Sequence, residues 1–184
     1  MERMLNMELF EAIRTRRSVR TYDPDRTVSR DTLEKIISAA QMAPSWKNTQ
    51  TAGFIVVESP EGKEKLMEAL PSYNARTVST APVTVVMTAK KGRAGYERDG
   101  SFTTGKGDRW EMFDGGIACQ TLCLAAWGEG LGSCIMGIYD EEKLPVLLEV
   151  PGDQYVTAVV SLGYPAETPN APKRKPLEEK VRYV

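Results

Sequence analysis

The sequence predicts a sandwich of helices around one β-sheet, of the α+β or α/β class. Short apolar runs of the kind that form buried strands alternate with longer segments in which apolar residues have helical spacing. The helical segments outweigh the strands, and the chain contains no internal repeat. Its 184 residues are enough for one well-developed core and too few for two ordinary domains. We therefore expect residues 1–184 to form a single domain.

Two helices are predicted ahead of the first strand. Asn6 can cap the first, which runs to about Thr15. The apolar side of this helix consists of Leu9, Phe10 and Ile13. Ser29 can cap the second helix, and Pro44 ends it near residue 42 because proline cannot continue a helix.

Four short apolar runs are predicted to be buried strands. They span residues 54–57, 83–89, 133–136 and 155–162. Ser59 and Pro60 start a helix that reaches about residue 70, and Asp140 starts one that ends near residue 148. A helix at about 110–129 is apolar on most of its faces, so we expect it to be central or to lie in a subunit interface.

Two long segments have neither pattern. Residues 90–109 are rich in glycine and charge, and a structureless connection of this length is typical of a functional lid or a mobile segment. Residues 163–184 carry four prolines and the basic run Lys173-Arg174-Lys175. They are therefore predicted to form an extended arm, which needs a surface to lie on.

Composition excludes several classes of partner. The 24 lysines and arginines are balanced by 25 acidic residues, and the net charge of −1 provides no basic field for nucleic acid. No apolar run approaches the roughly 18 residues that span a bilayer, and the first residues lack a secretory apolar region. We expect a cytoplasmic protein that binds neither nucleic acid nor membrane.

The cysteines and the missing histidines restrict the chemistry. Cys119, Cys123 and Cys134 lie in apolar surroundings without CxxC spacing, which predicts buried reduced thiols and no metal site. The chain has no histidine, so it lacks the commonest general base and the usual partner of a serine or cysteine nucleophile. An enzyme with this composition is expected to rely on a bound cofactor, which the protein orients.

The strongest candidate for a binding site is Arg16-Arg17-Ser18-Val19-Arg20. Three guanidiniums and a hydroxyl within five residues suit a phosphate group, although a solvated basic face is the alternative. The stretch 100–107 approaches the phosphate-loop pattern GxxxxGK[ST], but Gly107 stands where that pattern needs a hydroxyl.

Six motifs, in this order, resemble the FMN-dependent nitroreductase family. They are the arginine cluster, the loop Ala43-Pro44-Ser45-Trp46-Lys47-Asn48-Thr49-Gln50, Asn74, Asp114-Gly115, Gly130-Leu131-Gly132-Ser133-Cys134 with Met136-Gly137, and Lys173-Arg174-Lys175-Pro176-Leu177-Glu178-Glu179. The resemblance implies an α+β fold, a three-layer α/β/α sandwich with a central, mostly antiparallel sheet. It also implies an intertwined homodimer that binds FMN at the subunit interface and uses NADH or NADPH as electron donor.

The resemblance also implies roles for individual residues. The FMN phosphate would be held by Arg16, Lys173 and Arg174, with Arg17 and Ser18 on the phosphate, the ribityl chain or the ring edge. The ring would meet Arg20 near N1 and the C2 carbonyl, Asn74 at its polar edge, and the backbone of Met136 and Gly137 near N5. The partner subunit would contribute Pro44, Ser45, Trp46 and Asn48.

The implied reaction is transfer of a hydride from NAD(P)H through flavin N5 to an electron-poor small molecule, such as a nitroaromatic or a quinone, by a ping-pong scheme. Arg20, the expected catalytic residue, would stabilise negative charge on the reduced ring. Two features depart from the family pattern: Thr51 and Ala52 replace the frequent Pro-Trp pair, and residues 92–109 do not align. A specialised reaction such as reductive dehalogenation or flavin destruction, or a low-turnover FMN store or sensor, is the alternative.

Overall fold

A computed structural model describes residues 7–184, so the predicted cap at Asn6 lies outside the described residues. All four predicted strands are present: β1 (Ala52–Val57), β2 (Val83–Lys90), β3 (Gly132–Met136) and β4 (Gln154–Gly163). They form one sheet in the order β1-β2-β4-β3, and all three neighbouring pairs are antiparallel. The antiparallel sheet confirms the α+β class.

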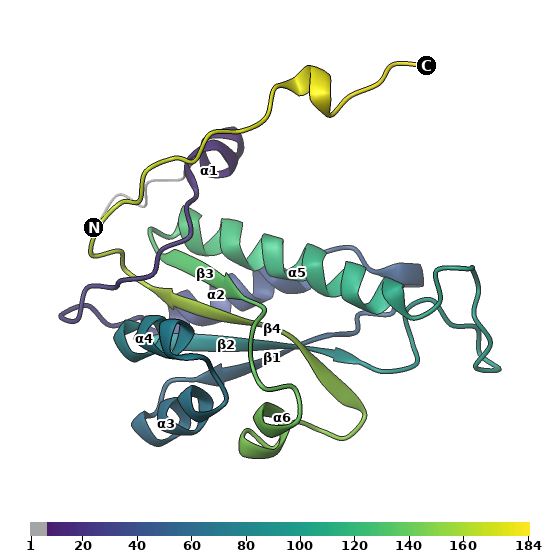
Figure 1. The fold of residues 1–184 in the computed structure, drawn as a ribbon, viewed down its shortest axis with the longest axis horizontal. Helices are drawn as coiled ribbons and strands as arrows, with labels where there is room; N and C mark the ends of the chain where they lie inside the picture. Colours follow the sequence, from purple (N-terminus) through teal and green to yellow (C-terminus); the bar gives the residue numbers. More distant parts are fainter. Residues whose placement is uncertain (1–6) are drawn as a thin grey trace.

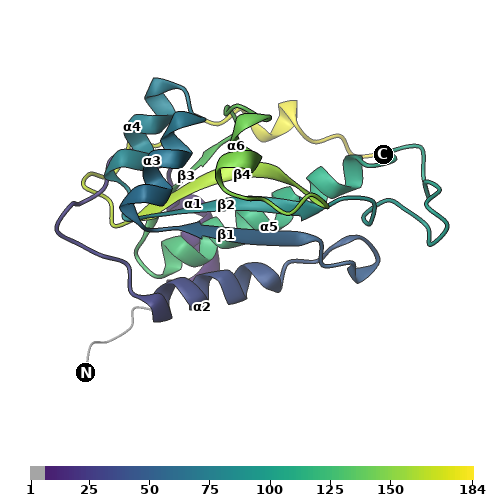
Figure 2. The same ribbon diagram turned by 90° about the horizontal axis from the view of Figure 1, so that it is seen from below.

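Helices cover both faces of this sheet (Figures 1 and 2). One face is covered by α2 (Arg30–Gln41) and α5 (Arg109–Gly128), and the other by α3 (Pro60–Glu68), α4 (Ser72–Thr80) and α6 (Lys143–Leu147). The alternation of side chains along β2 supplies both cores. Val85 and Met87 pack toward α2 and α5, whereas Val86 packs with residues of the opposite layer.

The predicted helix starts at Ser29 and Ser59 are confirmed. Each serine hydroxyl accepts a hydrogen bond of 3.1 Å from a backbone N–H three residues later, at Thr32 and Gly62. The cap predicted at Asp140 is present, although the regular helix α6 begins only at Lys143. The Asp140 carboxylate accepts from the N–H groups of Glu142 and Lys143 in the turn that precedes α6.

The sequence did not predict α4. This helix contains β-branched and polar residues of low helix propensity and has no side-chain cap. Its stability comes from packing, because Val78 is fully buried against the layer that also holds Leu66 and Val86. The tertiary contact overrides the local preference.

The segment after α1 (Leu9–Thr15) is fixed to the edge strand β3. Ser18 forms a parallel bridge with Ser133, and the Val19 N–H donates to the Ser133 carbonyl at 2.9 Å. Tyr22 is buried beside them, and its hydroxyl contacts the Val19 carbonyl at 2.8 Å and Ser161 Oγ at 2.7 Å. Burial raises the pKa of Tyr22, so the phenol stays protonated in this network.

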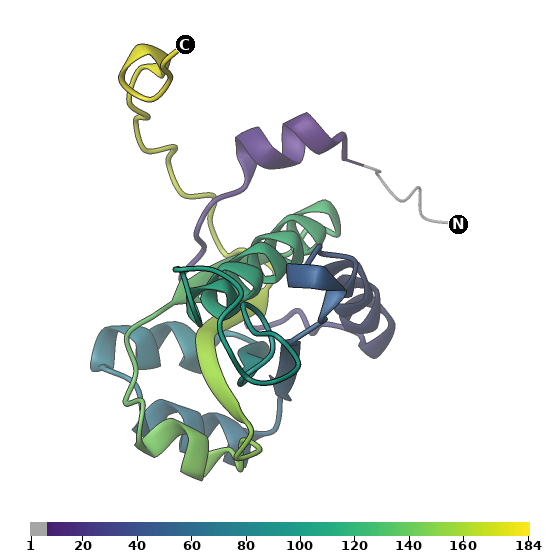
Figure 3. The same ribbon diagram turned by 90° about the vertical axis from the view of Figure 1, so that its right-hand side faces the viewer.

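Two segments extend away from the body on the same side (Figure 3). One is α1, whose Leu9, Phe10 and Ile13 are 60%, 83% and 52% exposed. The other follows β4 and contains only a short turn of 3₁₀ helix at Leu177–Glu179, and all residues from 171 to 184 are exposed. Within residues 7–184, no helix combines the length and the apolar character needed to cross a membrane.

Candidate functional site

The arginine cluster lies along the outer edge of β3. The chain between 7 and 184 provides no carboxylate partner for the guanidinium of Arg16 or Arg20. Arg17 is arranged differently, because its guanidinium donates to the carbonyls of Arg14 and Arg16 at 2.9 and 2.8 Å. Two cationic groups of the cluster are therefore available to an anion, while the third stabilises the end of α1.

Asn74, Met136 and Gly137 join this cluster at the same side of the sheet. The Asn74 side-chain amide donates to the Ile138 carbonyl at 2.9 Å, which fixes α4 beside the end of β3. Met136 is buried and Gly137 is exposed. Because Ser18 pairs with Ser133 on the same strand, these residues and the arginine cluster form one group.

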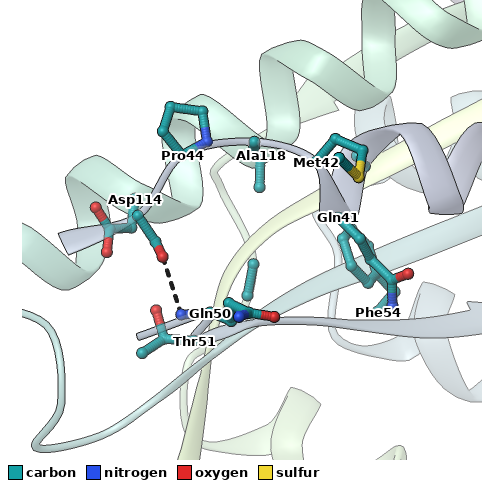
Figure 4. A pocket seen from close by; sticks show the side chains of 12 residues that line it. Gln41, Met42, Pro44, Gln50, Thr51, Phe54, Asp114 and Ala118 are labelled. Carbon is teal, nitrogen blue, oxygen red and sulfur yellow. Dashed lines mark hydrogen bonds between the residues drawn. The ribbon is translucent and has the colours of Figure 1, made fainter. Parts of the chain in front are cut away.

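The loop 43–50 forms a second group, which is attached to the N-terminal half of α5. The Trp46 N–H donates to Asp114 Oδ2 at 2.9 Å, and the Gln50 N–H donates to Ser45 Oγ at 2.9 Å. A cavity of about 320 Å³ lies beneath the loop, and its lining includes Pro44, Gln50 and Asp114 (Figure 4).

The backbone of this loop is strained. Lys47, Asn48 and Gln50 have φ angles of 45°, 56° and 51°, in the left-handed region that non-glycine residues seldom adopt. Such backbone persists only where surrounding contacts enforce it, and it concentrates at binding sites. The hydrogen bond to Asp114 is one of these contacts.

Two buried carboxylates on α5 support the loops, and sequence reasoning did not assign them this role. Burial raises the pKa of Asp114, and its hydrogen bond from the Trp46 N–H opposes the shift. Glu111 accepts from the Arg93 N–H at 3.1 Å and from the Tyr155 hydroxyl at 3.2 Å. Acidic residues on an otherwise apolar helix are the signal that could have identified both.

The segment 90–109, for which the sequence predicts a functional lid or a mobile segment, is folded. Tyr96 and Phe102 form a β-bridge and stack with ring centroids 4.8 Å apart. Lys47 Nζ pairs with Glu97 Oε1 at 2.7 Å, and this hydrogen bond lowers the pKa of Glu97. Trp46 packs on Trp110 at the start of α5, with 4.4 Å between ring centroids. The segment therefore lies against the loop 43–50.

Lys173 and Arg174 form a third group, on the exposed arm. The Arg174 side chain donates a long hydrogen bond of 3.4 Å to the Pro172 carbonyl, in its own arm. In one chain, the candidate residues thus fall into three separate groups. The first lies at β3, the second at the start of α5 and the third on the arm (Figure 1).

Comparison with known proteins identifies the family. A profile described as the nitroreductase family matches residues 13–76 and 68–164. The chain belongs to the nitroreductase family. A provisionally named NADH dehydrogenase/NAD(P)H nitroreductase of Archaeoglobus fulgidus is 35% identical over 164 residues, which cover 87% of each chain. An NAD(P)H FMN reductase of Bacillus subtilis is 29% identical over 93% of this chain and 71% of its own length.

Solved structures of the nitroreductase family have the same fold. The crystal structure of a family member from Clostridium novyi superposes with a TM-score of 0.75 at 32% identity, covering 90% of this chain and 89% of the other. A nitroreductase of Exiguobacterium sibiricum, described as a complex with FMN, has a TM-score of 0.84 over 97% of this chain and 98% of its own. At 21% identity, the second comparison shows the fold alone.

Proposed function

We propose that this nitroreductase-family protein is an FMN-dependent oxidoreductase that works as a homodimer. It transfers a hydride from NADH or NADPH to an electron-poor small molecule, such as a nitroaromatic or a quinone, by a ping-pong scheme. The observation that carries the proposal is the division of the candidate residues into groups that do not meet within one chain. A second copy can complete the site.

The first group fits an FMN phosphate. Arg16 offers a planar guanidinium without a carboxylate partner in the described residues, and the Ser18 hydroxyl lies on the same short segment. Lys173 and Arg174 add further cations on the arm, whose residues from 171 to 184 are all exposed. Guanidinium and hydroxyl donors match phosphate oxygens in geometry and in charge.

The residues next to this group fit the polar edge of an isoalloxazine ring. FMN supplies reversible two-electron chemistry when it is bound. Arg20 would stabilise negative charge on the reduced ring, while Asn74 and the backbone at Met136 and Gly137 would orient its polar edge. Arg17 supports the segment through its hydrogen bonds to two carbonyls.

Helix α5 supports the assignment of the loop residues to the partner. Asp114 holds the loop through Trp46, whereas the Trp127 indole N–H donates to Thr15 Oγ1 at 2.9 Å, just before the arginine cluster. At a rise of 1.5 Å per residue, these two anchors are about 20 Å apart along α5. Pro44, Ser45, Trp46 and Asn48 therefore reach the flavin of the other subunit.

Exposed apolar surface supports the same dimer. The apolar side of α1 and the outward face of α5 have no cover within residues 7–184, with Phe10 83% and Phe113 59% exposed. A two-fold axis near Gln120, halfway between the two anchors, would place the loop of each subunit beside the arginine cluster of the other. Gln120 lies on this exposed face.

The dimer is tested by cross-linking. Gln120→Cys should form a disulfide-linked dimer on mild oxidation, because residues next to a two-fold axis approach their own copies. The three native cysteines are buried, and Ser79→Cys on exposed α4 is the matched control. A monomer in light scattering would contradict the proposed dimer.

The flavin function is tested by replacing two charges. Arg16→Gln with Arg174→Gln should weaken FMN binding by about 100-fold or more, since each charge-assisted contact contributes roughly 1.5–3 kcal/mol and every 1.4 kcal/mol is a factor of ten. Arg182→Gln, on the same exposed arm, is the control. FMN affinity is measured by quenching of flavin fluorescence, and flavin reduction by stopped-flow mixing with NADH and NADPH. Protein that takes up no FMN would refute the proposal, and FMN that stays oxidised would favour a storage or sensor role.

A further inference from the structure

A second cavity lies between the loop 43–50 and the folded segment 90–109. It measures about 310 Å³ and is lined by Lys47, Thr49, Gly92, Arg93, Tyr96, Glu97 and Arg98. Lys47 stands between Trp46 and Asn48, which the proposed function assigns to the flavin of the partner subunit. The cavity therefore adjoins the space in which substrates of that flavin react.

The charge of this cavity is positive and unbalanced. Lys47 and Glu97 neutralise each other in an ion pair of 2.7 Å. The guanidiniums of Arg93 and Arg98 form neither an ion pair nor a side-chain hydrogen bond with any described residue. Two full positive charges thus remain on one small concave surface.

The cavity has a firm base. The backbone below Arg93 is fixed, because its N–H donates to buried Glu111 and its carbonyl accepts from the Tyr96 N–H.

We propose that this cavity binds an anionic group, a carboxylate or a phosphate monoester, carried by a substrate that reacts at the adjoining flavin. The proposal rests on the proposed function, because the flavin defines which molecules reach the cavity. Arg93 and Arg98 bind the anion as guanidinium forks, and the Tyr96 ring forms an aromatic wall. The anion can belong to the acceptor, as in an aromatic carboxylate, or to the donor, as in the 2′-phosphate of NADPH.

Binding without turnover gives the first test. Benzoate and benzamide have the same shape and differ in charge, and each is titrated into the oxidised FMN-loaded protein while flavin absorbance is recorded. Arg93→Gln with Arg98→Gln should weaken benzoate binding about 5- to 30-fold and leave benzamide binding unchanged. Lys106→Gln is the control, because Lys106 belongs to the same segment but lies over Trp110, outside the cavity lining. This substitution should leave benzoate binding unchanged.

Kinetics then distinguishes the two sources of the anion. If the acceptor supplies it, the double variant loses kcat/KM for 4-nitrobenzoate and keeps it for 4-nitrobenzamide. If the donor supplies it, reduction by NADPH weakens while reduction by NADH does not. Arg93→Lys with Arg98→Lys should restore part of the preference, because the charges return without the forks. One result would overturn this proposal alone: a double variant that retains FMN and is reduced by NADH, yet binds benzoate and NADPH as tightly as the native protein. Protein that takes up no flavin would overturn the proposed function as well.

Discussion

Replacing Gly132 with alanine should displace the arginine segment from the edge of β3. An added Cβ would lie 2.5 Å from Cγ2, 2.7 Å from Cβ and 3.0 Å from Cγ1 of Val19. Carbon atoms pack at roughly 3.5–4.0 Å, so one side must move by about 1 Å. Val19 is fully buried with Tyr22 and Trp127, and its N–H is bonded to the Ser133 carbonyl. The displacement therefore falls on the backbone that carries Arg16 and Arg20.

The size of the effect follows from overpacking. An extra methyl group in a filled core costs about 1–3 kcal/mol, and we expect Gly132→Ala to lose this amount of unfolding free energy. FMN affinity should fall by about tenfold or more, because a loss of 1.4 kcal/mol at the phosphate site corresponds to a factor of ten. Urea unfolding of the apoprotein gives the first quantity at a fixed protein concentration, and flavin fluorescence gives the second.

Two further variants isolate the contact. Gly128→Ala has nothing within 4 Å of its added Cβ, so its stability should equal or slightly exceed that of the native protein. Val19→Ala should cost about 1–3 kcal/mol by itself. It removes two of the three close contacts, so the double variant with Gly132→Ala should lose at least about 0.5 kcal/mol less than the sum of the single losses. Strict additivity, or a Gly132→Ala protein as stable as Gly128→Ala, would refute the reasoning.

Asp114 and the cysteines give two further tests. Asp114→Ala leaves the Trp46 N–H without its acceptor and should cost about 1–3 kcal/mol in urea unfolding, whereas Asp114→Asn keeps an acceptor. Burial raises the pKa of Asp114 in the folded protein, so ionisation of this carboxyl favours the unfolded state. The unfolding free energy of the native protein should therefore fall, relative to that of Asp114→Asn, as the pH rises from the ordinary pKa of 3.8 through the raised pKa. A constant difference between the two unfolding free energies from pH 3 to pH 7 would contradict this. The 3 cysteines are free and buried, so a thiol reagent such as dithiobis(nitrobenzoate) should react slowly with native protein and with all three in denaturant. Rapid reaction of the native protein would contradict the burial of these cysteines on α5 and β3.

Local sequence patterns were sufficient to predict a structural element where its boundaries depend on its own residues. The serine caps of α2 and α3 satisfy their N–H groups within one turn, so the sequence specified both helix starts. Helix α4 depends instead on burial of Val78 in a layer assembled from distant elements. Its polar and β-branched composition gave no local sign of a helix.

The order of the segment 90–109 could not be predicted from its own residues for the same physical reason. Its glycines and charges resemble a structureless connection, yet its order comes from partners outside it. Glu111 binds the Arg93 N–H, and Lys47 pairs with Glu97. A pattern confined to the segment contains neither partner, so the fold of this region and the cavity beside Arg93 could only be seen in three dimensions.

The family resemblance, rather than any local pattern, assigns Pro44, Ser45, Trp46 and Asn48 to the flavin of the partner subunit, and this assignment stays a prediction. The separation of the two anchors on α5 supports the assignment, and mixed dimers test it. Each of Arg16→Gln and Asp114→Ala should weaken FMN binding in its own homodimer. If the loop serves the partner's flavin, a heterodimer of the two variants contains one site with native arginines and a native loop, and one site with both defects. Such a heterodimer, isolated with two affinity tags, should bind one FMN with native affinity. If loop and arginines of the same chain formed each site, every site would carry one defect, and no native-affinity FMN would be found.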